Sequence, residues 1–115
     1  MYRVQNLTSN GRQRQILVLP DGTQVLFTLA FSPLQGCWFI PRLEYQNWVL
    51  RGLKITTNAN MLFQFRNQIP FGLACFTDNQ REPSLIEDFS SGASRLFILS
   101  EDEVDYFTRV ISGEV

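Results

Sequence analysis

The sequence predicts a mainly β fold: a small antiparallel β-barrel or sandwich that ends in a short helix. Apolar residues at every second position indicate a strand with one buried face, as at Val25, Phe27, Leu29 and Phe31. Turn motifs rich in Gly, Pro and Asn separate several such runs. The segment SEDE, residues 100–103, is a capping box that starts a helix near the C-terminus.

The length and composition predict one domain. The chain has 115 residues, of which 44% are hydrophobic, so it can bury one core and is short for two. Ten phenylalanines add large apolar side chains, each stabilising the fold by about 1.5–3 kcal/mol when buried. We expect a single domain over residues 1–115. Residues 1–10 are a candidate N-terminal arm, because an extended segment there ends at the turn Ser9-Asn10-Gly11.

Four strands are expected in succession, at residues 12–19, 23–32, 36–45 and 48–52. Pro20-Asp21-Gly22 is a turn motif that makes a hairpin of the first two. Successive antiparallel strands form a meander or part of a small barrel. Pro41 cannot donate a hydrogen bond to a neighbouring strand, so its strand should lie at an edge, be bulged or bend there. Trp38 on the same strand is expected to anchor the core.

The second half of the chain is less regular. We expect a loop at 53–60, a helical turn or a strand at 61–68, and a buried strand at 73–77. A surface turn at 78–82, a long connection at 83–94 and a last strand at 95–99 should follow. In the long connection, Leu85, Ile86 and Phe89 should anchor to the core and leave Glu87 and Asp88 outside. Connections of this length are often functional or form interfaces.

A short helix is predicted from Glu101 to Ile111. The side chains of Ser100 and Glu103 can each accept from the other's backbone N–H, and acids in the first turn favour the positive end of the helix. The apolar residues of this segment share one helical face and are Val104, Phe107, Val110 and Ile111.

The charge of the chain does not favour nucleic acid or an anionic membrane. Ten basic and eleven acidic residues give a net charge of -1. Arg12 and Arg14 alternate with glutamines on one strand, which indicates a solvated edge or a protein contact, so no nucleic-acid binding is expected. The N-terminus lacks the apolar core of a signal peptide, and no run approaches the ~20 apolar residues that span a bilayer. We expect synthesis in a cytoplasm and no membrane segment.

Nothing in the sequence indicates an enzyme, a metal site or a cofactor. There is no histidine, so the commonest general base and metal ligand are missing. The acids of 101–105 fit a helix start better than a catalytic pair, and no phosphate-binding glycine motif is present. Cys37 and Cys75 lie in apolar runs and are read as small buried hydrophobes, although a disulfide is possible if their strands are neighbours.

The order of segments resembles the baseplate plug domain of contractile-tailed bacteriophages. The resemblance covers nearly the whole chain and is carried by ILVLPDGTQVLFTLAF, GCWFIPRLEY, WVLRGLKI, NANMLFQF, LACFTD and EPSLIEDFSSGASRLFILSEDE. Pro41 and the long C-terminal helix depart from the family pattern. The resemblance implies a structural protein of the virion tail, without catalytic residues, that assembles near the tail axis in the host cytoplasm. Its partners would be tube, hub and wedge proteins and copies of itself, with three- or six-fold symmetry.

Contacts between subunits are expected at the N-terminal arm, the long connection and the C-terminal helix. The candidate interface residues are Tyr2, Arg3, Val4, Leu7, Leu85, Ile86, Phe107, Val110 and Ile111. The alternative function is that of a β-barrel that holds a small apolar ligand or a glycan among its many aromatic rings. An enzyme is the least favoured class, because no general base is available.

Overall fold

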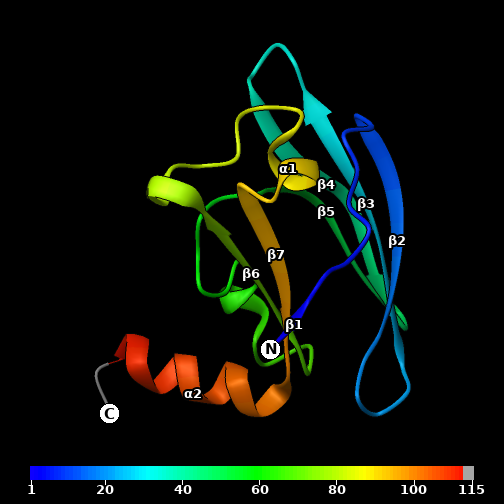
Figure 1. Cartoon of the computed structure of the whole chain (residues 1–115). Coiled ribbons are helices and arrows are strands. Elements are labelled where there is room, and N and C mark those ends of the chain that lie inside the picture. Colours follow the sequence, from blue (N-terminus) through cyan, green and yellow to red (C-terminus); the bar gives the residue numbers. More distant parts are fainter. Residues whose placement is uncertain (113–115) are drawn as a thin grey trace.

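The computed structural model describes residues 1–112 and contains two antiparallel sheets that pack face to face (Figure 1). The first sheet has the order β2-β3-β4-β5, with bounds Arg12–Val18, Gln24–Ser32, Cys37–Tyr45 and Trp48–Lys54. The second sheet has the order β1-β7-β6, with bounds Tyr2–Arg3, Ser94–Leu99 and Gly72–Thr77. The mainly β prediction is confirmed, and the arrangement is sandwich-like because the sheets do not close into a barrel.

Four helical segments complete the fold of residues 1–112. They are η1, Phe63–Phe65; η2, Asp78–Gln80; α1, Asp88–Ser91; and α2, Glu101–Ser112. The stretch 61–68, predicted as a helical turn or a strand, therefore contains the short helix η1. None of the helices in the described part of the chain is long and apolar enough to cross a membrane.

The β2–β3 hairpin forms at the predicted turn. The backbone N–H of Leu19 donates to the carbonyl of Thr23 at 2.8 Å, and the Asp21 carboxylate accepts from the backbone N–H of Thr23 at 3.0 Å. Gly22 has φ of 90°, a conformation that costs glycine little. This turn sets the register of the first two strands, so that Val18 faces Gln24.

Pro41 lies within the sheet and not at its edge. Its strand, β4, is hydrogen-bonded to β3 on one side and β5 on the other. The predicted bulge is present, because the β3–β4 register shifts between Thr28 and Ala30. On the β5 side, Ile40 pairs with Leu53 and Arg42 with Arg51, so Pro41 falls where no pair forms. The bulge lets a residue without an N–H sit in a central strand.

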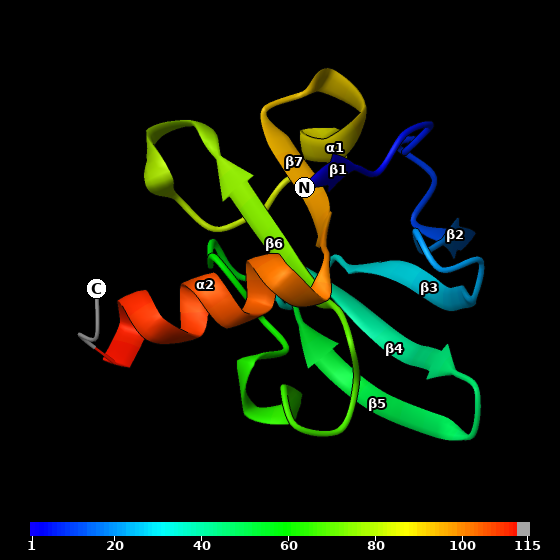
Figure 2. The ribbon, with the colours of Figure 1, turned by 90° about the horizontal axis from the view of Figure 1, so that it is seen from below.

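The main core lies between the two sheets. The predicted alternation on β3 is confirmed for Val25, Phe27 and Leu29, which are buried in this core, while Phe31 is only partly buried against it. Trp38 on β4 is fully buried, as the prediction of a core anchor requires. From the second sheet, Leu73 and Leu96 enter the same core. Figure 2 shows the two sheets facing one another across it.

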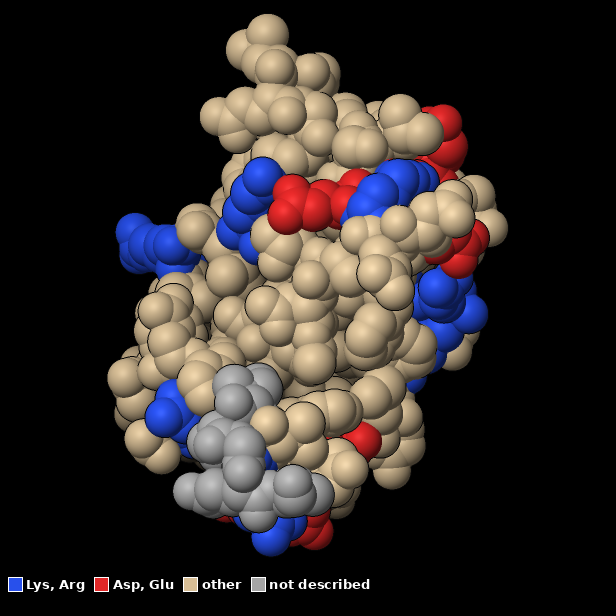
Figure 3. Space-filling model, turned by 90° about the vertical axis from the view of Figure 1, so that its left-hand side faces the viewer, with Lys and Arg blue, Asp and Glu red and all other residues tan. Residues whose placement is uncertain are grey.

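A smaller apolar cluster lies on the other side of the second sheet. Ala74 of β6 and Leu99 of β7 pack there with Val104 of α2. The rings of Phe76 and Phe97, whose centroids are 5.7 Å apart, are only partly buried beside them. Figure 3 views the side on which β6 and α2 lie: charged residues form a band across its upper part, and the central area directly below the band is uncharged, while charged residues recur toward the bottom.

The helix α2 starts at the predicted capping box. The Ser100 backbone N–H donates to Glu103 Oε1 at 3.0 Å, and the Glu103 N–H donates to Ser100 Oγ at 3.3 Å. These two bonds satisfy backbone groups that a helix start otherwise leaves open. Val104, the first residue of the predicted apolar face, is buried.

The two cysteines are buried and not bonded to each other. Burial raises the pKa of the Cys75 thiol to about 11, which keeps it protonated at neutral pH. The prediction that both behave as small buried hydrophobes is confirmed.

Replacing Gly72 by alanine should destabilise the fold by about 1–3 kcal/mol. A Cβ at position 72 would lie 2.7 Å from Asn60 Oδ1. That oxygen is needed in place, because it accepts from the backbone N–H groups of Leu62 and Leu73 at 3.0 and 3.1 Å. Urea unfolding measures the loss. Gly11→Ala is the control: its Cβ would meet only Ile86, at 3.8 Å, and an equal loss there would contradict the prediction.

Candidate functional site

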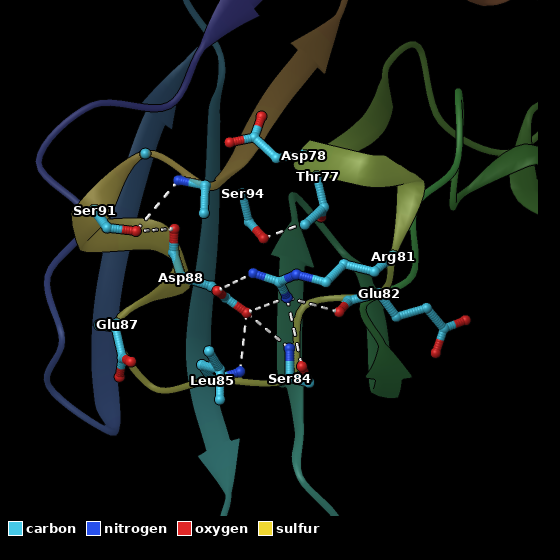
Figure 4. Close-up of polar contacts among 12 residues, drawn as sticks. Thr77, Asp78, Arg81, Glu82, Ser84, Leu85, Glu87, Asp88, Ser91 and Ser94 are labelled. Atoms are coloured by element: carbon cyan, nitrogen blue, oxygen red, sulfur yellow. Dashed lines mark hydrogen bonds and ion pairs between the residues drawn. The ribbon is translucent and has the colours of Figure 1, made fainter.

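The long connection after β6 is held by a buried carboxylate. Asp88, the first residue of α1, is only 1% exposed. The Arg81 guanidinium donates to both of its oxygens, at 2.8 Å from Nη1 and 2.6 Å from Nη2 (Figure 4). Bidentate pairs of this kind fix geometry as well as adding energy. Asp88 was predicted to lie outside, and this was wrong because the guanidinium of Arg81 compensates its burial.

The same carboxylate organises the backbone between the two partners. Asp88 Oδ2 also accepts from the backbone N–H groups of Ser84 and Leu85, at 2.8 and 2.9 Å. The hydrogen bonds from Arg81 are the main reason why the pKa of Asp88 is lowered to about 2. Asp88 therefore stays ionised at neutral pH and holds four donors at once. We call this segment the 81–91 loop.

The 81–91 loop is also tied to the main core. The Trp38 Nε1–H donates to the carbonyl oxygen of Leu85 at 2.9 Å. Phe89 packs its ring edge-on against Trp38, with centroids 5.4 Å apart. At the start of the loop, Thr57 Oγ1 donates to the Arg81 carbonyl at 2.6 Å. Phe89 thus anchors the connection as predicted.

Two apolar side chains of the 81–91 loop face solvent. Leu85 is 51% exposed and Ile86 is 39% exposed. Both were predicted to anchor the connection, and this was wrong, because the backbone of Leu85 is held by Trp38 and Asp88 while its side chain is left outside. A fixed backbone with exposed apolar side chains is suited to contact another protein, since little conformational entropy is lost on binding.

The N-terminal residues lie against the second sheet. Tyr2 and Arg3 form β1, which pairs antiparallel with β7, and both side chains are exposed. The Val4 N–H donates to the Leu96 carbonyl at 2.8 Å, and its side chain is buried in the main core. Leu7 is partly buried against that core. Of the predicted interface residues here, only Tyr2 and Arg3 are presented to solvent.

The α2 residues of the predicted interface are also divided. Phe107 packs partly buried against the smaller cluster, and Val110 is exposed. The side chain of Ile111 lies outside the described residues. The helix start is tied to the N-terminus, because the Met1 amino group lies 2.6 Å from the Glu103 carboxylate. The structure therefore brings the first residues of the chain beside α2.

The outer face of the first sheet carries most of its charge as arginine. The four strands contain five basic residues and one acid, and the acid, Glu44, forms an ion pair with Arg42. A cavity of about 290 Å³ opens on this face and is lined in part by Arg12, Arg14 and Ile16. Arg12 and Arg14 were noticed from the sequence, but Arg42 and Arg51, which reach the same face from other strands, were missed. The strand register was the missing signal.

No metal-binding constellation occurs within residues 1–112, where no three His, Cys, Asp or Glu side chains are grouped as ligands would be. No protein-family model and no curated protein matches this chain. The resemblance to the baseplate plug domain therefore rests on the order and spacing of segments in the sequence.

Proposed function

We propose that this protein is a structural subunit of a contractile-tail baseplate, whose work is to bind neighbouring tail proteins. The observation that supports a binding role is the 81–91 loop, where the buried Asp88 carboxylate and the partly exposed Arg81 hold the backbone that presents the exposed side chains of Leu85 and Ile86. The order of sequence segments supports the baseplate. Tube, hub and wedge proteins would be the neighbours, and copies would surround the tail axis with three- or six-fold symmetry.

Cryo-electron microscopy of intact tailed particles tests the baseplate assignment. Particles would be purified from cells that express the chain from its own locus, and density that fits the two sheets should occur near the tail axis. A complete tail reconstruction with no such density would refute the proposal. Native mass spectrometry addresses the alternative of a ligand-binding domain, because a purified monomer with a stoichiometric small molecule would support that alternative instead.

The loop contact is tested by changing Leu85 and Ile86 together to aspartate. Both side chains are exposed, so the fold should survive, while the chain should no longer enter the baseplate, because carboxylates would have to be desolvated in the contact. Incorporation is measured by quantitative mass spectrometry of purified tails. The control is Leu34→Asp, a fully exposed leucine at the β3–β4 turn, which should incorporate normally. Normal incorporation of the Leu85/Ile86 variant would exclude this loop from the interface.

A further inference from the structure

Outward side chains of the first sheet line up in rows that cross all four strands. The register pairs Arg14 with Thr28, Thr28 with Arg42, and Arg42 with Arg51. Neighbouring strands are about 4.8 Å apart, so this row spans about 14 Å of surface. We call these four residues the arginine row. Three of its four members carry a positive charge.

The arginine row is only partly neutralised within its own chain. Arg42 and Arg51 are directly opposite on neighbouring strands, an arrangement that is unfavourable for like charges. Glu44 compensates Arg42. For Arg14 and Arg51, which are exposed, the described part of the chain supplies no ion-pair partner. A partner with carboxylates at this row would relieve the repulsion.

A second row, mostly apolar, runs beside the first. It joins Ile16, Leu26, Glu44 and Val49 through the same register. Ile16 is 61% exposed and Val49 is 41% exposed. The two rows are two residues apart along each strand, or about 7 Å. We call this second set the apolar row. Nucleic acid would offer phosphates to the arginines and nothing to the apolar row, whereas an acidic amphipathic helix would match both.

The outer face of α2 has these two properties. Glu101, Asp102 and Asp105 are exposed in its first turns, and Tyr106 and Val110 are exposed beside them. At about 100° per residue, the three acids and the exposed Arg109 lie on one side of the exposed face, which stays net negative, and Tyr106 and Val110 lie on the other. A helix is about 10–12 Å wide with its side chains, so these two sides can cover two rows about 7 Å apart.

The position of α2 prevents it from reaching the arginine row of its own chain. It packs on β6 and β7 and extends away from the body, on the side opposite to β2 (Figures 1 and 2). A contact between α2 and the first sheet must therefore join two molecules. Such a contact uses a different surface on each partner, so it joins copies head to tail and closes into a ring when the rotation allows.

We propose that α2 of one copy docks on the outer face of the β2–β5 sheet of the next copy. The acids Glu101, Asp102 and Asp105 face the arginine row, and Tyr106 packs on the apolar row. This inference rests on the proposed function, in which copies of the chain assemble with one another, and it names the surfaces that they use. The contact is separate from the 81–91 loop.

Charge reversal on each surface tests this docking. The sheet variant carries Arg14→Glu and Arg51→Glu, and the helix variant carries Asp102→Arg and Asp105→Arg. Each alone brings like charges together, so self-association of the full chain, measured by sedimentation velocity at low salt, should weaken at least about tenfold. In an equal mixture, copies that alternate between the two variants, in open chains or in rings of even number such as six, have opposite charges at every contact. The association of the mixture should return to within about threefold of the unmodified protein.

Three further measurements keep the test decisive. Circular dichroism and thermal melting check that each variant folds, and Tyr106→Ala should weaken association without changing any charge. Leu34→Arg, at the fully exposed β3–β4 turn and in neither row, is the control and should associate normally. Failure of the mixture to restore association, or wild-type association in either variant, would overturn the proposal. So would a protein that stays monomeric at all concentrations, or one that binds duplex DNA or RNA through Arg14 and Arg51.

The docking and the baseplate assignment can fail independently of each other. If the chain is found in the tail but both charge-reversal variants incorporate normally, the docking is wrong and the baseplate assignment stands. If no tail contains the chain but the mixed variants restore association, the docking stands and the baseplate assignment is wrong.

Discussion

Trp38→Ala should lower the free energy of unfolding by about 4 kcal/mol. The Trp38 side chain is 0% exposed, and its ring packs against Phe31 and Phe89 with centroids 5.3 and 5.4 Å away. Truncation would leave a large cavity and also remove the donor to the Leu85 carbonyl. Urea unfolding followed by circular dichroism gives the loss directly.

Trp48→Ala provides a matched control for this prediction. Trp48 is only partly buried, packs on Phe65 at 5.3 Å between centroids, and donates from Nε1 to Gln68 Oε1 at 3.0 Å. Its removal leaves a smaller cavity, so the free energy of unfolding should fall by no more than about 2 kcal/mol. Equal losses in the two variants would show that Trp38 does not have the central packing role described above.

Asp88→Ala should destabilise the protein by about 3 kcal/mol, because it removes the buried acceptor of four part-buried hydrogen bonds. The backbone N–H groups of Ser84 and Leu85 would lose their partner, and so would Arg81. Amide hydrogen exchange should show the 81–91 loop opening more often. Asp78→Ala is the control, because Asp78 makes an exposed ion pair with Arg95 and should contribute less than about 1 kcal/mol. Similar losses at both positions would contradict the prediction.

The lowered pKa of Asp88 also predicts that the free energy of unfolding depends on pH. Its pKa is lowered from 3.8 to about 2 in the folded protein, so folding favours the ionised form. The stabilisation is complete above pH 3.8 and is lost as the pH falls through about 2, and by linkage it amounts to about 2 kcal/mol. The difference in stability between the wild type and Asp88→Asn should shrink as the pH falls from 3.8 to about 2. A constant difference from pH 5 to pH 2 would refute the assignment.

Local patterns predicted much of the first sheet and little of the second. The four-strand meander follows from alternation and from turns such as Pro20-Asp21-Gly22, which pair strands that are neighbours in sequence. The helix α2 follows from the Ser100 capping box. By contrast, β1 pairs with β7 from the opposite end of the chain, and no local signal specifies such a partner. The central position of Pro41 could not be predicted either. An edge strand was one expectation because proline cannot donate a hydrogen bond to a neighbouring strand, and the bulge removes that cost.

The candidate site was found in part. The 83–94 connection was singled out by its length, but the exposure of Leu85, Ile86 and Asp88 was inverted, because an acid such as Asp88 is buried only when a specific cation reaches it. Arg81 is seven residues away, and nothing local marks the pairing. More of the arginine row could have been predicted from the sequence, since the turns that join the strands of the meander set the register of those strands. The bulge at Pro41 then decides which residues of β3 and β4 face one another.

The arginines also bear on the solubility of the protein. The outer strands of the first sheet, β2 and β5, each leave one side open for another strand to add. They carry Arg12, Arg14, Arg51 and Lys54. Edge-to-edge pairing of two such strands would set like charges against each other and is disfavoured, which guards newly made chains against aggregation. The sheet therefore remains open to partners that approach its face while it repels copies that approach its edges.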